Sequence, residues 1–213
     1  MPQAIIRHPV DSDLPVLVEI YAACFADRVL EIFGGPHRSA FIADYLRFYL
    51  AWDPANAWVY EHDNHVVAVV IAPCRYAPLK AALFRGQVFS WFWHLLTGRY
   101  GLPLHIFRLF LNSGFAFNED AVIRELWGRP YIHLFAVAPG SQGQRFGAKL
   151  LEWTLEQFRR QAVECCWLLV QKDNHRAIKL YEKFGFRCRQ LQGSGDLVMI
   201  WGDLQAAAHQ HER

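Results

Sequence analysis

The chain has 213 residues, 53% of them apolar and 15% aromatic, so it is too hydrophobic for a disordered protein and long enough for one domain with a sizeable core. A formal net charge of +2 gives no strong field toward nucleic acid, and no nucleic-acid partner is expected. Five cysteines without paired spacing favour a reducing compartment, and the opening MPQAIIRHPV lacks the apolar core of a signal peptide, so we expect a cytoplasmic protein.

The first third of the chain predicts a strand, two helices and a hairpin. A β-rich run at 3–9 is followed by helical periodicity over 11–27, with Asp11 or Ser12 as the expected N-cap. A second helix is predicted over 38–51, after a Gly-Gly-Pro break. Residues 57–73 read as a hairpin, because two β-rich runs flank the polar EHDNH.

Residues 75–128 interrupt this regularity with an aromatic-rich segment. Charged and polar side chains, such as Arg85, His94 and Arg108, break it too often for a membrane span of about 20 apolar residues. We expect two or three helices packed around aromatic side chains, forming an insertion within a single domain that covers residues 1–203. The polar tail 204–213 is expected to fray.

After Pro130 strands and helices alternate again. Apolar residues at helical spacing, including Leu151, Leu155 and Phe158, predict a long helix directly after a buried strand. The expected elements are strand 131–138, helix 143–161, strand 165–171, helix 174–184 and strands 186–192 and 196–202.

The stretch QGQRFG, residues 142–147, joins the first of these strands to the long helix. A glycine-rich turn at a helix N-terminus can bind an anion, because unpaired backbone N–H groups and the positive end of the helix dipole face the same point. Taken alone the signal is weak, since the stretch lacks the GK[ST] of a nucleotide-triphosphate loop and the GxGxxG of a dinucleotide fold. Glycines that merely permit tight strand–helix packing explain it equally well.

A second motif, NHRAIKLYEKFGF at 174–186, favours the anion-binding reading. Together the two segments resemble the GNAT superfamily of N-acetyltransferases, whose acetyl-CoA loop reads Q/R-x-x-G-x-G/A and whose later motif reads N-x-x-A-x-x-L-Y-x-K-x-G-F. The layout is most similar to the puromycin N-acetyltransferase-like type. The resemblance implies a mixed α/β (α+β) fold: a mostly antiparallel sheet of about seven strands, flanked by helices and splayed at strands 4 and 5. The helical insertion would lie between strands 3 and 4.

The resemblance also implies the chemistry. Acetyl-CoA is the expected acyl donor, and an amine attacks the thioester directly, so the site needs a base for the ammonium proton and an acid for the thiolate. Tyr181 occupies the position of the family's general acid, and His133 is the candidate base. The residues expected to bind the cofactor are Phe135, Ala136, Val137, Gln142, Gly143, Gln144, Arg145, Phe146, Gly147, Ala148, Asn174 and Tyr181.

Each role has a structural alternative. Tyr181 could be a core tyrosine, His133 a buried structural histidine, and Asn174 a helix N-cap. Alternation along the strand predicts that His133 shares a face with residues 131, 135 and 137. Arg145 stands where the family usually has a glycine, and its guanidinium could grip a phosphate or crowd it.

The function prediction is an acetyl-CoA-dependent N-acetyltransferase that acts on a primary amine of a small molecule or peptide. The alternative is a catalytically weak or inactive module of the same fold that binds acyl-CoA or a partner protein. No metal is expected: His62 and His65 have H-x-x-H spacing but no third ligand. The acceptor amine, the length of the acyl group and a homodimer remain open.

Overall fold

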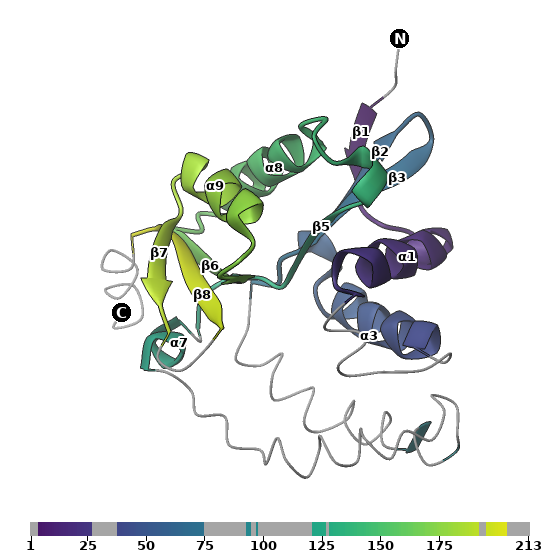
Figure 1. The fold of residues 1–213 in the computed structure, drawn as a ribbon, viewed down its shortest axis with the longest axis horizontal. Helices are drawn as coiled ribbons and strands as arrows, with labels where there is room; N and C mark the ends of the chain where they lie inside the picture. Colours follow the sequence, from purple (N-terminus) through teal and green to yellow (C-terminus); the bar gives the residue numbers. More distant parts are fainter. Residues whose placement is uncertain are drawn as a thin grey trace.

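The computed structural model describes residues 4–26, 38–74, 93–94, 97, 121–126, 128–191 and 195–203. Two four-stranded sheets lie side by side and are joined by the segment 131–137 (Figure 1). The first has the order β1-β2-β3-β5 and the second the order β4-β6-β8-β7. The strands follow the predicted runs, so the mixed, mostly antiparallel sheet is confirmed.

The first sheet is antiparallel throughout. Its hairpin turns at Asp63 and Asn64, whose φ angles of 49° and 62° are those of a tight left-handed turn, which asparagine and aspartate tolerate. Its strands are β1 Ala4–Arg7, β2 Ala57–His62, β3 His65–Ile71 and β5 Leu134–Val137.

The second sheet contains one parallel pair. Tyr131 and Ile132 of β4 pair in parallel with Trp167 and Leu168 of β6, whereas β6–β8 and β7–β8 are antiparallel. Its strands are β4 Tyr131–Ile132, β6 Cys165–Gln171, β7 Arg187–Gln190 and β8 Asp196–Gly202. The predicted strand 131–138 is therefore two short strands that belong to different sheets.

Helices cover both faces of the first sheet. On one face α1 (Leu14–Cys24) and α3 (Arg38–Trp52) pack on Val59, Val69 and Leu134. On the other, α8 (Phe146–Arg160) packs on a core that continues into the second sheet through Cys166 and Met199. Two shorter helices, α7 (Ala121–Leu126) and α9 (His175–Lys183), lie against the second sheet (Figure 1).

Two helices, α1 and α8, begin three residues later than the sequence predicted. Residues Asp11–Asp13 form a 3₁₀ turn, and α1 begins at Leu14 with Asp13 as its N-cap, not Asp11 or Ser12. The Asp13 carboxylate accepts hydrogen bonds from Arg7 Nη1 at 2.7 Å and from the Val10 amide at 2.8 Å, and the bond from Arg7 holds its pKa below the usual range. These bonds tie the start of α1 to β1. The second late start, that of α8, shapes the site described below.

Most of the predicted insertion 75–128 lies outside the described residues, as does the tail 204–213. Only α7 and a few single positions of the insertion are described. Among the helices that the structure does describe, none has the length and apolar character needed to cross a bilayer.

Candidate active site

The two sheets separate at the segment 131–137. Up to Ile132 the chain pairs with β6, but from Leu134 to Val137 it pairs only with β3, with Leu134 opposite Ile71 and Val137 opposite Ala68. Among the described strands, β5 is therefore the last of the first sheet, and its outer edge carries main-chain groups that none of them pairs. The predicted splay between the fourth and fifth strand runs lies here.

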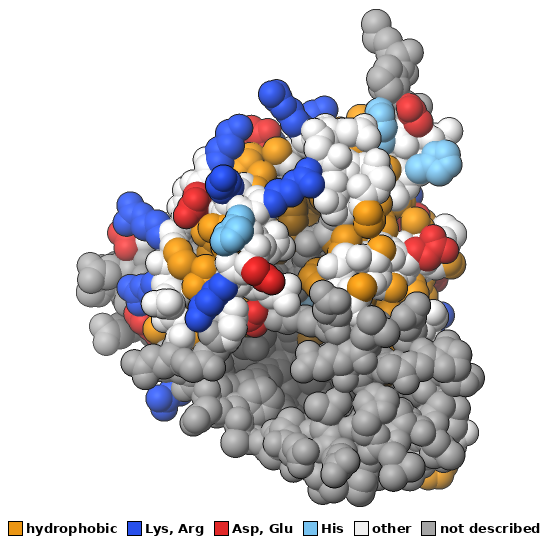
Figure 2. Space-filling model, in the orientation of Figure 1, with side chains coloured by type: hydrophobic (Ala, Val, Ile, Leu, Met, Phe, Trp, Pro, Cys, Tyr) orange, Lys and Arg blue, Asp and Glu red, His pale blue; other side chains and the backbone are white. Residues whose placement is uncertain are grey.

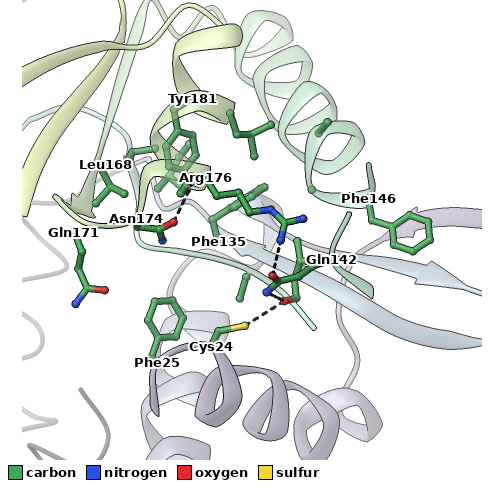
Figure 3. Close-up of a pocket in the computed structure, with 18 of the residues that line it drawn as sticks. Cys24, Phe25, Phe135, Gln142, Phe146, Leu168, Gln171, Asn174, Arg176 and Tyr181 are labelled. Atoms are coloured by element: carbon green, nitrogen blue, oxygen red, sulfur yellow. Dashed lines mark hydrogen bonds between the residues drawn. The ribbon is translucent and has the colours of Figure 1, made fainter. Parts of the chain in front are cut away.

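A cavity of about 780 Å³ fills this splay. It runs from the turn after β5, past the ends of β5 and β6, to the C-terminal end of α1, where Cys24 and Phe25 form a wall (Figure 3). All predicted site residues except the exposed Gln144 line it. Its described lining contains the cations Arg145, Arg176 and Lys179 and no aspartate or glutamate.

The turn at 142–147 adopts a left-handed course that delays the helix. Gly143 has a φ of +90° and Arg145 a φ of +65°, so α8 begins at Phe146 rather than at the predicted residue 143. The N-cap and the first three helical residues, 145–148, have amides without an intrahelical acceptor. These amides and the positive end of the helix dipole meet at the turn, which makes it a suitable anion site.

Gly147 is compatible with both interpretations of the glycine-rich stretch, tight strand–helix packing and anion binding. A Cβ at this position would lie 3.1 Å from Val137 Cγ2 and 3.6 Å from Phe135 Cε1, so the glycine permits close packing of α8 on β5. The same packing brings the helix N-terminus to the unpaired edge of β5. Tight packing and anion binding are thus compatible roles.

A chain of side-chain bonds crosses the mouth of the cavity (Figure 3). Arg176 Nη1 donates to Gln142 Oε1 at 2.9 Å, and Gln142 Nε2 donates to the Val137 carbonyl at 3.2 Å. The same carbonyl accepts from Cys24 Sγ at 3.2 Å, and burial raises the pKa of this thiol, which keeps its proton. Val137 thus presents a main-chain acceptor that polar side chains already use.

Sequence reasoning missed Arg176, Cys24 and Phe25. The position of Arg176 was predictable from topology. Arg176 stands in the first turn of α9, which directly follows β6. Because β6 runs parallel to β4, α9 begins at the same end of the sheet as the turn 142–147. Cys24 and Phe25 reach the cavity only because α1 packs across β5. That contact joins segments more than 100 residues apart, and no local pattern encodes it.

Positive charge surrounds the end of the cavity formed by the turn 142–147 and α9. Figure 2 shows lysine and arginine side chains gathered over α8 and α9 at this end.

Tyr181 is buried at the inner part of the cavity. Its ring meets Phe135 edge-on at 5.9 Å between centroids and lies 5.5 Å from Phe186. Burial raises the pKa of its phenol above the usual value, so the hydroxyl stays protonated at neutral pH. No described residue hydrogen-bonds this hydroxyl, which leaves its proton available to a group in the cavity. The arrangement suits a proton donor.

Asn174 caps α9, with its Oδ1 accepting from the Ala177 amide at 3.1 Å. The predicted N-cap is confirmed, and the side chain also lines the cavity. No residue in the described part of the chain bonds its side-chain nitrogen, which is left for a ligand. At the other end of the site Phe146 is buried against Tyr60 and His62, with centroids 5.0 and 4.8 Å away, so its side chain is structural.

His133 lies between β4 and β5, where the chain changes sheets. Its ring stacks on Tyr49 at 3.7 Å, and its Nε2 is 2.6 Å from the Tyr45 hydroxyl. Phe135 faces the α8 side of the sheet instead, so the expected alternation fails at residue 133. The change of sheets breaks the pleat on which alternation depends. Burial lowers the pKa of His133 to about 3, and the ring is neutral at neutral pH.

His62 and His65 lie at the β2–β3 hairpin and do not line the cavity. His65 Nδ1 is 2.7 Å from the Asp63 carbonyl oxygen. Within the described residues, no group of three histidine, cysteine or carboxylate side chains is placed to hold a metal ion.

Comparisons with known proteins agree with this architecture. The chain is 29% identical over 102 residues to the [ribosomal protein bS18]-alanine N-acetyltransferase of Escherichia coli K12, covering 48% of this chain and 68% of that enzyme. PH1933 from Pyrococcus horikoshii OT3 superposes with a TM-score of 0.62 at 18% identity, covering 94% of this chain and 99% of that one. The PaiA N-acetyltransferase of Thermoplasma acidophilum, solved with coenzyme A, has a TM-score of 0.59 at 12% identity, with the same coverage.

These two structural likenesses show the fold. The family itself is shown by the model of the acetyltransferase (GNAT) family, which matches residues 26–186. That range contains the splay, the 142–147 turn, Asn174 and Tyr181. The chain belongs to the acetyltransferase (GNAT) family and is an N-acetyltransferase.

Proposed function

We propose that the protein transfers an acetyl group from acetyl-CoA to the α-amino group at the N-terminus of a peptide or protein. The observation that carries the proposal is a cavity with the N-terminal amides of α8 at one end and a protonated, buried Tyr181 further in. The solved relative with coenzyme A supports the donor. The E. coli relative, named for an alanine of ribosomal protein bS18, supports a peptidic acceptor.

The donor would be held by main-chain groups. The amides of 145–148 bind its pyrophosphate, aided by the cations Arg145 and Arg176. The unpaired edge of β5 accompanies the pantetheine arm. The Val137 carbonyl belongs to the edge that the arm follows. An amide N–H of the ligand would therefore replace Gln142 Nε2 as the donor to this carbonyl.

The reaction needs two proton transfers. The neutral amine attacks the thioester carbon, a C–N bond forms, and the C–S bond breaks as the tetrahedral intermediate collapses. Tyr181 donates its proton to the departing thiolate, and the proton lost by the amine leaves through water. Positioning of amine and thioester supplies the remaining catalysis.

The acceptor class follows from charge. An α-amino group has a pKa of about 7.7–8.0 and is roughly one-third neutral at pH 7.5, whereas about one lysine side chain in 10³ is neutral. The described lining offers no carboxylate to hold a cationic amine. A weakly basic α-amine therefore fits the cavity better than a lysine side chain or a polyamine.

The test couples binding with turnover. Acetyl-CoA and coenzyme A should both raise the thermal midpoint of the protein. Thiol release should then appear with an alanine-initiated peptide and not with the same peptide Nα-blocked and carrying a free lysine. Stabilisation without thiol release for any amine would support the non-catalytic acyl-CoA-binding alternative. Turnover on the lysine peptide alone would contradict the proposed acceptor class.

A further inference from the structure

His133 is in contact with tyrosines from two elements, α3 and β4. Tyr49 of α3 stacks on its ring at an interplanar angle of 11°, and Tyr131 of β4 meets it edge-on at 5.6 Å. Tyr45 of α3 contacts His133 through both its ring and its hydroxyl. Tyr45 in turn hydrogen-bonds Tyr21 of α1. We call Tyr21, Tyr45, Tyr49 and Tyr131 the tyrosine cluster. Tyr21 of α1 and Tyr45 of α3 are thus linked to the His133 ring.

The length of the bond between Tyr45 and His133 favours the tyrosine hydroxyl as the donor. This length of 2.6 Å is that of a bond donated by a hydroxyl, whereas an N–H donor typically lies about 2.9–3.0 Å from an oxygen. Burial raises the pKa of Tyr45 and lowers that of His133, so both groups are neutral. The acceptor atom on the ring is then Nε2.

The second ring nitrogen is left for the cavity. His133 lines the cavity, Nε2 is occupied by Tyr45, and no described residue hydrogen-bonds Nδ1. In a neutral imidazole that accepts at Nε2, the proton resides on Nδ1. The ring nitrogen that no described residue bonds is therefore an N–H group. This differs from a base, which must present a lone pair.

We propose that Tyr45 holds His133 in the neutral tautomer protonated at Nδ1, so that His133 presents a hydrogen-bond donor, not a general base, to a carbonyl oxygen of the reacting pair. Tyr45 is then a positioning residue that acts through the histidine. The proposal rests on the proposed acetyl transfer for its substrate oxygen, although the tautomer is a property of the free protein. It also leaves deprotonation of the amine to water, which a weakly basic α-amine permits.

The tautomer can be measured directly. In the full chain labelled with ¹⁵N-histidine, the His133 signals are assigned by their loss in His133→Asn. We expect a protonated Nδ1, an unprotonated Nε2 and no titration between pH 5 and 8. Tyr45→Phe removes the donor and should produce a mixture of tautomers, while the control Tyr49→Phe, which removes a hydroxyl from the same helix, should not. A wild-type ring protonated at Nε2, or one unchanged by Tyr45→Phe, would overturn the proposal.

Activity gives an independent readout. The side-chain amide of asparagine lies close to where Nδ1–H of histidine lies, so His133→Asn should retain about tenfold more kcat than His133→Ala, a factor typical of one hydrogen bond. Tyr45→Phe should lower kcat and leave the KM for acetyl-CoA unchanged. Equal losses in the asparagine and alanine variants, both reversed by raising the pH, would identify His133 as the base. If no amine is acetylated, the proposed function fails, and the ¹⁵N measurement still decides the tautomer.

Discussion

Replacing Arg145 by glycine separates the backbone role of this position from its charge. Arg145 is the N-cap of α8 with φ +65° and ψ 9°, a conformation that costs a residue with a Cβ about 1–2 kcal/mol. Glycine adopts it freely but loses about 0.4–1 kcal/mol more conformational entropy on folding. The free energy of unfolding should therefore rise by roughly 0.5–1 kcal/mol in Arg145→Gly.

Urea denaturation measures this difference as a shift of the midpoint at constant slope. Arg145→Ala is the matched control, because it removes the same guanidinium but keeps the Cβ and hence the strain. Only the glycine variant should be stabilised. Equal stabilisation of both variants would show that the left-handed conformation carries no cost here, and the reasoning from φ would be wrong.

Coenzyme A binding tests the role of the Arg145 charge. The Arg145 side chain is exposed, so it can move aside and does not block a ligand. Both the glycine and the alanine variant lose its positive charge. We expect both to bind about tenfold more weakly, near the lower limit for a charge-assisted hydrogen bond, and Arg145→Lys to bind with nearly wild-type affinity. Tighter binding by the glycine and alanine variants in a calorimetric titration would mean that the arginine crowds the phosphate.

Three further changes test the rest of the site. Gly147→Glu should abolish stabilisation by acetyl-CoA in a thermal shift, and Gly147→Ala, which adds the same Cβ 3.1 Å from Val137 but no charge, should retain part of it. Tyr181→Phe should keep acetyl-CoA affinity and lower kcat by about 10²–10⁴-fold; full activity with chemistry limiting the rate would assign the acid elsewhere. Because the His133 pKa falls from 6.5 to about 3 on folding, the unfolded state binds more protons between these values. Stability should therefore drop by about 2 kcal/mol from pH 7.5 to 5.0, a loss that His133→Asn should remove in urea titrations.

The periodic parts of the chain were predictable from sequence. Helix α8 and the strands β2, β3 and β6 follow from apolar spacing, and the two motifs located the turn 142–147, Asn174 and Tyr181, because glycines and caps act locally. Segment ends were less accurate. The helical pattern extends back to residue 143, but the left-handed residues there do not continue a helix, so α8 begins at Phe146.

Features set by tertiary contact could not be predicted. Cys24 enters the site through the packing of α1 on β5, and Tyr45 through the packing of α3 near the strand division. Tyr21, Tyr45 and His133 are linked by hydrogen bonds but lie far apart in sequence. In the sequence each of them fits the ordinary apolar pattern of its own segment. Arg176 is intermediate, since its place after β6 gave a topological signal.

The division of the strand at residue 133 explains both the cavity and the one failed face assignment. A continuous strand would keep residues 131, 133, 135 and 137 on one face and would pair β5 with β6 along its length, which would close the splay. Opening the splay requires the chain to turn where it leaves β6, and His133 is the residue at that turn. The turn directs its Nε2 to Tyr45 of α3, whereas Tyr181 packs with Phe135 on the side of β5 that faces α8. Architecture and chemistry are therefore coupled at this residue: the geometry that opens the splay also buries His133, whose lowered pKa makes it a weak base, and the acceptor that we propose is an amine that loses its proton to water.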